Sequence, residues 1–328
     1  MIKIIVDTAG GDKSPDVNIE GALAALQKYE DLHIVFVGDE EVIRQKLSDA
    51  TCDESRMEIV DAKDVITCND SPAAAIRTKK ESSLYKAFEL LKHREDANAL
   101  VSSGSTGAIL AGAVLKLGRI KGIKRPAMCP LLPTINGKFV AICDSGANMD
   151  CDSTMLFQFG LMASLYLQKA YGVEKPDVAL LNVGAEPEKG DALRKETYQL
   201  LSQCDSIHFV GNMESRNLLS GAYDVVVCDG FAGNVLCKAT EGTGLELSKL
   251  IGAMLAKNRQ AAMLLKDDVA SLRSFMDYNN YGGAVLLGAA KTIVKAHGSC
   301  EAVTVLHCIE QAYRMEQNHL NEEIAALL

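Results

Sequence analysis

The sequence lacks the residue spacings that mark most familiar catalytic and metal sites. None of its ten cysteines forms a Cys-x-x-Cys pair, and there is no His-Glu-x-x-His run, so nothing resembles a zinc site or a thioredoxin motif. A Gly-x-Ser-x-Gly elbow is missing, as are a Walker loop and a Rossmann Gly-x-Gly-x-x-Gly after the first strand. These gaps disfavour serine hydrolases, P-loop enzymes and ordinary dinucleotide-binding enzymes.

Long apolar runs and an excess of positive charge are missing as well. No uninterrupted apolar stretch reaches the length of a membrane span, and the chain opens on the strand Ile2 to Val6 without the charged segment of a signal peptide. The net charge of −9 argues against nucleic acid as the main partner. Cys143 and Cys228 lie within apolar strands, which predicts buried thiols in a reducing compartment.

What the sequence does contain is a regular alternation of strand and helix patterns. The 48% of hydrophobic residues and the mean hydropathy of +0.05 indicate a globular chain with a sizeable core. Alternation of this kind predicts an α/β fold in three layers, with helices on both faces of a mainly parallel sheet. No linker or repeat marks a boundary, so we expect a single domain over residues 1–328. Ligands of such sheets bind at the carboxyl ends of strands, where we look for chemistry.

One stretch organises the chain. The valines of residues 225–227 predict a buried strand, Asp229 ends it, and Gly230 and Gly233 allow a tight turn with a close backbone approach. Helical spacing follows from Asn234, whose amide stands where unpaired helix amides attract an anion or a polarised carbonyl. A plain strand–helix turn with an asparagine cap is the more common interpretation of such a stretch alone.

Similar turns recur at other predicted strand ends. Residues 102–108, rich in serine and glycine, open a helix, which suits phosphate as well as it suits an ordinary capped helix start. Residues 144–148 form a third such turn, and residues 183–190 a fourth that carries Lys189. His297 follows a short apolar stretch; it is a possible base, although a histidine in that setting is more often a cap or core residue.

Two further stretches have several possible uses. Residues 245–265 predict a helix with an apolar side, which suits a membrane surface, a dimer interface or core packing, the last being the commonest use. Residues 116–125 hold five basic side chains and no acid, which is usually a solvated face but also suits docking of an acidic partner.

Taken together, the turns suit an anion bound beside an electrophile. If inorganic phosphate is itself the nucleophile, no covalent side-chain nucleophile is needed. The protein then orients two reactants and stabilises a developing oxyanion, for which a lysine and an asparagine amide suffice.

The motifs, in their order, resemble those of the phosphate acyltransferase family, and the resemblance covers nearly the whole chain. The matching stretches are Asp7-Thr8-Ala9-Gly10-Gly11-Asp12, Arg77 to Ser83, Ser102 to Ala108, Arg119 to Ala127, Leu131 to Thr134, Gly146-Ala147-Asn148, Asn182 to Gly190, Gly211 to Glu214, Asp229 to Asn234, Tyr281 to Ala284 and Lys295-Ala296-His297-Gly298-Ser299. Two positions depart from the family pattern: Ala9 replaces a methionine, and Ser105 replaces an asparagine, with the loss of two amide donors. The departures put substrate preference and rate in question, not the reaction class.

The resemblance implies transfer of a long-chain acyl group from acyl carrier protein to inorganic phosphate, giving acyl phosphate for phospholipid synthesis. It implies a fold similar to isocitrate and isopropylmalate dehydrogenases, a cytoplasmic homodimer with peripheral membrane association, and no metal, nicotinamide or other cofactor. Residues 245–275 become the candidate dimer or membrane-contact element.

Site residues follow from the same resemblance. Lys189 would stabilise the thioester oxyanion or hold phosphate, and Asn234 would orient the carbonyl. The expected substrate- or phosphate-binding residues are Gly104, Ser105, Thr106, Gly107, Asp229 and Gly233, and the expected supporting residues are Asp7, Asp12, Asn148 and His297.

Other functions stay open. A short-chain acyl-coenzyme A:phosphate transferase would differ only in the donor. A membrane adaptor without activity would bind acyl carrier protein through the basic run. An oxidative decarboxylase of the same fold is disfavoured because no aspartate cluster suits magnesium.

Overall fold

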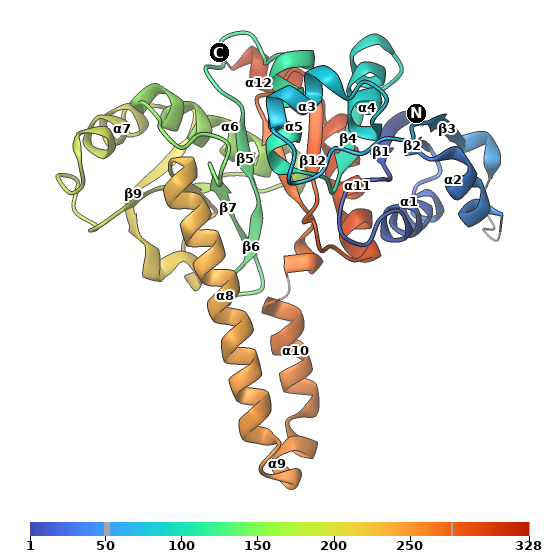
Figure 1. The fold of residues 1–328 in the computed structure, drawn as a ribbon. Coiled ribbons are helices and arrows are strands. Elements are labelled where there is room, and N and C mark those ends of the chain that lie inside the picture. Colours follow the sequence, from blue (N-terminus) through green and yellow to red (C-terminus); the bar gives the residue numbers. More distant parts are fainter. Residues whose placement is uncertain (49–52, 277, 328) are drawn as a thin grey trace.

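Two β-sheets lie side by side, and helices cover both (Figure 1). The structure is a computed structural model, and it describes residues 1–48, 53–276 and 278–327. Most strand pairs are parallel, which confirms the predicted α/β class. The expected single sheet is instead divided into sheets of seven and five strands.

The seven-stranded sheet has the order β3-β2-β1-β4-β12-β11-β5. Its first five strands are parallel, and β11 is antiparallel to both of its neighbours. Strands buried on both faces need apolar side chains throughout, as in β1 and β2. The bounds are β1 Ile2–Asp7, β2 Leu32–Gly38, β3 Met57–Asp61, β4 Ala99–Ser102, β5 Ala127–Cys129, β11 Ala284–Leu287 and β12 Thr292–Lys295.

The five-stranded sheet has the order β6-β7-β10-β8-β9, with only β6 antiparallel to its neighbour. A single residue, Pro130, separates β5 from β6, so the chain passes there from one sheet to the other. The bounds are β6 Leu131–Pro133, β7 Phe139–Cys143, β8 Asp177–Asn182, β9 His208–Glu214 and β10 Val225–Val227.

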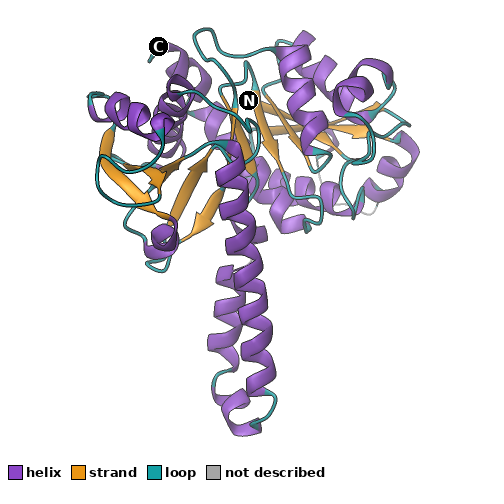
Figure 2. Ribbon diagram, turned by 60° about the vertical axis from the view of Figure 1, so that its left-hand side comes forward, coloured by secondary structure: helices purple, strands orange, loops and turns teal. Residues whose placement is uncertain are grey.

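Helices cover both faces of the sheets (Figure 2). On one face, α1 and α11 join α6 in a core that continues from one sheet to the other, and on the opposite face α3, α4 and α5 cover the seven-stranded sheet. The helices are α1 Asp16–Lys28, α2 Glu40–Leu47, α3 Pro72–Thr78, α4 Ser83–His93, α5 Thr106–Gly112, α6 Ser153–Tyr171, α7 Ala192–Ser202, α8 Gly230–Leu255, α9 Arg259–Leu264, α10 Lys266–Met276, α11 Ala302–Gln317 and α12 Leu320–Ala326. Short 3-10 helices span Glu54–Arg56, Ser215–Ser220 and Tyr278–Tyr281, and a π-helical turn spans Ala113–Leu117.

A helical arm projects from this body (Figures 1 and 2). It consists of the distal part of α8, the short α9 at the tip, and α10, which returns beside α8. The predicted single helix over residues 245–265 is therefore wrong, because the chain reverses after Leu255. None of the helices in the described part of the chain is long and apolar enough to cross a bilayer.

The start of α8 also differs from the prediction. The helix begins at Gly230 and is capped by Asp229, whose side chain accepts a hydrogen bond from the Ala232 amide (2.8 Å). Gly230 and Gly233 therefore lie in the first helical turns instead of in a loop, and Asn234 is not a cap. The predicted close approach is present, because a Cβ on Gly233 would lie 1.9 Å from the carbonyl oxygen of Asp144.

This contact gives a prediction for two glycines of the same helix. Gly233→Ala should lower the free energy of unfolding by at least about 1–3 kcal/mol, because the methyl group must displace the backbone at Asp144. Gly242→Ala is the matched control, since nothing lies within 4 Å of its Cβ position. It should raise stability by about 0.5–1 kcal/mol through helix propensity.

Urea unfolding followed by circular dichroism compares the two variants with the parent protein. A Gly233→Ala protein as stable as Gly242→Ala would contradict the close docking of α8 on the loop after β7.

Candidate functional site

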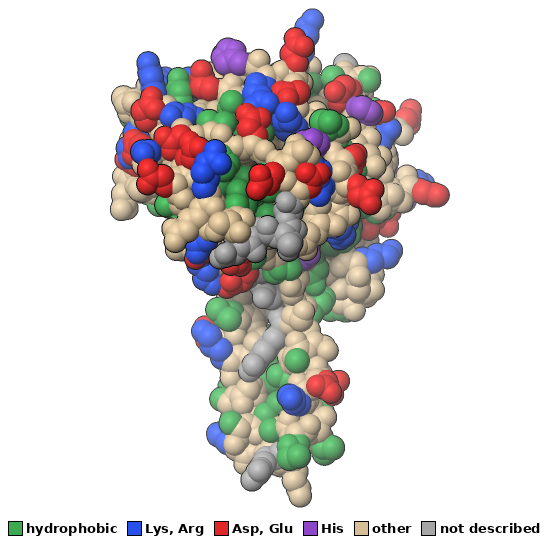
Figure 3. Space-filling model, turned by 90° about the vertical axis from the view of Figure 1, so that its right-hand side faces the viewer, with side chains coloured by type: hydrophobic (Ala, Val, Ile, Leu, Met, Phe, Trp, Pro, Cys, Tyr) green, Lys and Arg blue, Asp and Glu red, His purple; other side chains and the backbone are tan. Residues whose placement is uncertain are grey.

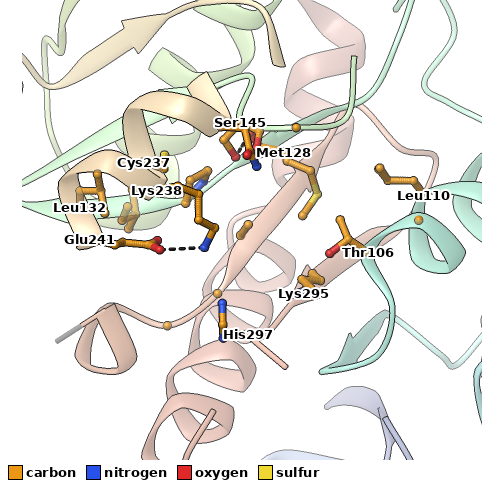
Figure 4. A pocket seen from close by; sticks show the side chains of 18 residues that line it. Thr106, Leu110, Met128, Leu132, Ser145, Cys237, Lys238, Glu241, Lys295 and His297 are labelled. Carbon is orange, nitrogen blue, oxygen red and sulfur yellow. Dashed lines mark hydrogen bonds and ion pairs between the residues drawn. The ribbon is translucent and has the colours of Figure 1, made fainter. Parts of the chain in front are cut away.

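A cleft of about 450 Å³ lies where the two sheets meet (Figure 4). Its walls come from the starts of α5 and α8, from the β5–β6 passage, from the loop after β7, and from the β11 and β12 ends. Four of the predicted site residues, Thr106, Gly107, Asn234 and His297, line it. The other lining residues are Leu110, Met128, Pro130, Leu131, Leu132, Ser145, Gly146, Cys237, Lys238, Glu241, Gly282, Gly283, Ala284 and Lys295.

The buried carboxylate of Asp144 holds the loop that forms one wall of the cleft. It accepts hydrogen bonds from the backbone amides of Met128 (2.8 Å), Gly146 (3.3 Å), Ala147 (3.1 Å) and Asn148 (2.7 Å). The Asn148 side-chain amide adds a fifth (3.0 Å). Burial raises the pKa of Asp144, and these hydrogen bonds oppose that shift. Asn148, predicted as a supporting residue, therefore orders this loop.

Asn234 joins that loop to helix α8. Its side-chain amide donates to the backbone carbonyl of Ser145 at 3.2 Å, and its residue lines the cleft. A primary amide has two donor hydrogens, so one remains available for a bound group. Gly233, one residue earlier, permits the approach on which this contact depends.

Asp229 lies outside the cleft. Its carboxylate caps α8 and forms an ion pair with Arg194 of α7, so it ties two helices together at the ends of β8 and β10. It lines a second hollow of about 340 Å³ with Arg194, Phe231 and Cys151 among others.

The serine-rich turn after β4 divides into two parts. Ser102 donates to the buried carboxylate of Asp7 (2.7 Å), Ser103 donates to the Gly10 carbonyl, and a Cβ on Gly10 would lie 2.6 Å from the Gly104 amide nitrogen. These groups fasten the turns after β1 and β4 to each other, and burial raises the pKa of Asp7. Asp7 and Gly104 thus have structural partners and lie outside the cleft lining.

The second part of that turn reaches the cleft. Thr106 and Gly107 open α5 and line the cavity, with Gly107 packed closely against Pro72. Ser105 precedes the helix without capping it and is not among the lining residues. The departure at Ser105 therefore falls beside the cleft and not in its wall.

Basic side chains also line the cavity. Lys295 and His297 come from the end of β12, and Lys238 from α8, where it pairs with Glu241 (2.7 Å). Burial, followed by the charge of Lys238, lowers the pKa of Lys295. Burial and the two lysines lower the pKa of His297, which keeps the imidazole neutral at neutral pH.

Lys295, Lys238 and Glu241 were missed as site residues by sequence reasoning. Lys295 stands in the same motif as His297 at the end of an apolar strand, which was a usable signal. No sequence signal distinguished Lys238 and Glu241 from an ordinary exposed pair on a helix.

Lys189 lies in the loop between β8 and α7 and does not line the cleft. Its side chain is exposed, while its backbone is held by the Asn182 side chain (3.1 Å) and by a bond to Glu186 (3.1 Å). The side-chain amide of Asn212 fixes the same loop through the Glu186 carbonyl (2.8 Å). The result is an ordered loop that presents an ammonium group at the end of the strand next to β10.

Two remaining predictions concern Asp12 and the basic run. The Asp12 amide donates to the Gly298 carbonyl (2.7 Å), so Asp12 steadies the loop that follows His297.

The basic run leads into Ala127, which pairs with Leu287, whereas the cleft lies at the Pro130 and Ala284 end of the same strands. The run therefore leads into the end of β5 that points away from the cleft.

Known proteins include close sequence relatives of this chain. The sequence matches the family described as "Fatty acid synthesis protein" over residues 2–323. A phosphate acyltransferase of Clostridium acetobutylicum is 42% identical over 328 residues, covering 99% of this chain and 98% of the relative.

Solved structures with the same fold include a phosphotransacetylase from Staphylococcus aureus, with a TM-score of 0.61, 16% identity and coverage of 95% and 94%. A structure described as a putative 4-hydroxythreonine-4-phosphate dehydrogenase, from Salmonella typhimurium, has a TM-score of 0.55, 13% identity and coverage of 96% and 99%. These two show the fold alone, and the second confirms the expected likeness to dehydrogenases. The near-complete match to the family and the identity to its relatives carry the assignment: this chain belongs to the phosphate acyltransferase family.

Proposed function

We propose that this chain transfers a long-chain acyl group from acyl carrier protein to inorganic phosphate. The observation that carries the proposal is the composition of the cleft, whose lining combines apolar side chains such as Leu110, Leu131 and Leu132 with the basic side chains of Lys295 and Lys238. An acyl thioester requires an apolar wall, and a phosphate requires cations and donors. A reaction between these two substrates requires both in one cavity.

The reaction balances without a covalent enzyme intermediate. An oxygen of hydrogen phosphate attacks the thioester carbonyl carbon, the carbon–sulfur bond breaks, and acyl phosphate and thiol form. The proton of the phosphate passes to the departing sulfur. His297, neutral and in the cleft wall, is the group proposed to carry that proton.

Asn234 and Lys189 are the proposed catalytic residues. Asn234 offers its second amide hydrogen to the carbonyl oxygen as that oxygen becomes negative, with its own position fixed by the Ser145 carbonyl. Lys189 lies on the ordered loop after β8, next to β10. Its ammonium group adds positive charge when a bound donor extends from the cleft across the ends of these two strands.

The other predicted site residues contact the phosphate or hold the turns that form the site. Thr106 and the amide of Gly107 meet the phosphate in the cleft, and Gly104 and Ser105 shape the turn that presents them. Gly233 and Asp229 set the start of α8, and Asp7, Asp12 and Asn148 fix the three neighbouring turns.

The donor has one alternative. The S. aureus structure with the same fold is a phosphotransacetylase, which favours a short-chain coenzyme A thioester as the second candidate.

The arm is the proposed element for dimerisation and membrane contact. Leu247, Leu250 and Met254 of α8 are each more than half exposed, and at the tip Met263 and Leu264 reach 72% and 82%. Figure 3 shows hydrophobic side chains along this projection. Apolar surface of this extent suits a second copy along the sides and a lipid surface at the tip.

The function is tested first by incubating the protein with palmitoyl acyl carrier protein, with and without phosphate. Free carrier and acyl hydroxamate, trapped with hydroxylamine, should appear only when phosphate is present. Gel separation of the acylated and free carrier is preferable to a thiol reagent, because the protein exposes Cys68.

The controls separate the alternatives. Turnover with acetyl-coenzyme A but not with the carrier would transfer the proposal to the second candidate. Carrier binding with no release from either donor would reject acyl transfer in favour of an adaptor.

Lys189→Ala and Asn234→Ala should each lower kcat by about 10²- to 10³-fold, as expected for the loss of one oxyanion donor. Thermal unfolding should change little, because neither side chain is buried. Lys195→Ala, an exposed lysine of the adjacent helix, should leave kcat unchanged. Near-normal turnover of either variant would remove that residue from the chemistry.

Replacing Met263 and Leu264 by aspartate should reduce binding to phosphatidylglycerol vesicles by about 10-fold or more in a sedimentation assay. The expectation follows from the loss of two apolar side chains at the tip. Val42→Asp, an exposed apolar position on the body, should bind like the parent.

Light scattering should give twice the 35.2 kDa chain mass for both the parent and the tip variant. Unchanged sedimentation of the tip variant would contradict membrane contact through the tip, and a monomeric parent would contradict the dimer.

A further inference from the structure

Lys295 is the cation of the cleft that has no counterion. It ends β12, in the interior of the seven-stranded sheet, and is in register with Ser102 of β4 and Ala284 of β11. Its side chain is partly buried and lines the cavity. Within residues 1–48, 53–276 and 278–327, its ammonium group has no hydrogen-bond or ion-pair partner. A partly desolvated charge without a partner is unfavourable and favours a ligand of opposite sign.

The other basic groups near the cleft are less able to attract an anion than Lys295. Lys238 is neutralised by Glu241 at 2.7 Å, and its side chain is half exposed. Lys189 lies outside the lining, and His297 is held neutral by burial and by the two lysines. Lys295 is therefore the strongest anion-attracting group of the cavity wall.

A hydroxyl group stands beside this ammonium. Thr106 lines the same cavity, and Figure 4 shows it next to Lys295 on the side of the cleft away from Lys238. Its hydroxyl has no partner in the described part of the chain. Lys295 and Ser102 are register partners on hydrogen-bonded strands, and Thr106 follows Ser102 by four residues, so the two groups are held by rigid elements.

We infer that Lys295 and Thr106 form the subsite for the phosphate nucleophile. The ammonium neutralises the phosphate and donates to one of its oxygens, and the Thr106 hydroxyl donates to another. Asn234 lines the same cavity, so a phosphate held there can reach a carbonyl bound beside Asn234. This inference rests on the proposed function and assigns the phosphate to a lysine other than Lys189.

The same chemistry would also suit the phosphate of the donor's pantetheine arm, and the experiment separates the two sources. Lys295→Gln should raise the KM for inorganic phosphate by about 10- to 100-fold, the loss expected for charge-assisted hydrogen bonds. The KM for the acyl carrier donor should stay unchanged, and Lys295→Arg should recover part of the loss. Lys291→Gln, one residue before the start of the same strand, is the matched control and should behave like the parent.

Binding of inorganic phosphate alone, followed by titration calorimetry, distinguishes this inference from the proposed function. If the parent binds phosphate but transfers no acyl group, the proposed function fails while the subsite is still decided by Lys295→Gln. If Lys295→Gln binds phosphate like the parent, the subsite is rejected. A raised KM for the carrier, with an unchanged KM for an acyl pantetheine lacking its phosphate, would assign Lys295 to the donor and overturn the inference.

A second variant decides the question should Lys295→Gln fail to fold. Thr106→Val keeps the shape of the side chain and removes only the hydroxyl, and it should raise the KM for phosphate about 2- to 10-fold. No change in Thr106→Val, with normal thermal unfolding, would reject the two-residue subsite.

Discussion

The site depends first on a buried carboxylate and the donors around it. Asp144 accepts five hydrogen bonds: three come from the backbone amides of residues 146–148, one from the Met128 amide of β5 and one from the Asn148 side chain. Burying a carboxylate without such donors costs several kcal/mol, so the loop folds around the charge. Two carbonyl groups of the loop face helix α8: Gly233 leaves room for that of Asp144, and the Asn234 side-chain amide donates to that of Ser145. One interaction thereby fixes both the wall of the cleft and the helix that carries its proposed catalytic amide.

The cleft exists because the chain passes from one sheet to the other beside it. Pro130 stands between β5 and β6, and the two strands belong to different sheets. At this junction, the end of β12 and the start of α5 face the start of α8 from the other sheet. The apolar and basic side chains of the cleft therefore come from elements far apart in sequence, each rigid by itself. The cavity owes its mixed chemistry to this meeting of two sheets and not to any single motif.

Local sequence patterns predicted much of the fold, but they did not predict which distant residues meet in the cleft. Strands such as residues 225–227, apolar on both faces, predicted parallel pairing correctly because burial on both faces is typical of a parallel sheet covered by helices. The start of α8 was mistaken because glycine suggests a turn, whereas here it permits close packing inside a helix. Lys295 and Thr106 could not be paired from the sequence, since nearly 190 residues separate them and only the β4–β12 register brings them together. The antiparallel strand β11 was unpredictable for the same reason, because its direction is set by its neighbours.

Helix α8 connects the cleft mechanically to the arm. Its 26 residues extend about 39 Å at the usual rise of an α-helix. Asn234, Lys238 and Glu241 lie in its first turns at the cleft, and the exposed apolar side chains of Leu247, Leu250 and Met254 lie further along the same rod. No loop interrupts it before Ala256, so the direction of the arm is fixed relative to the cleft. Whatever surface the arm contacts therefore also sets the orientation in which the cleft mouth faces that surface.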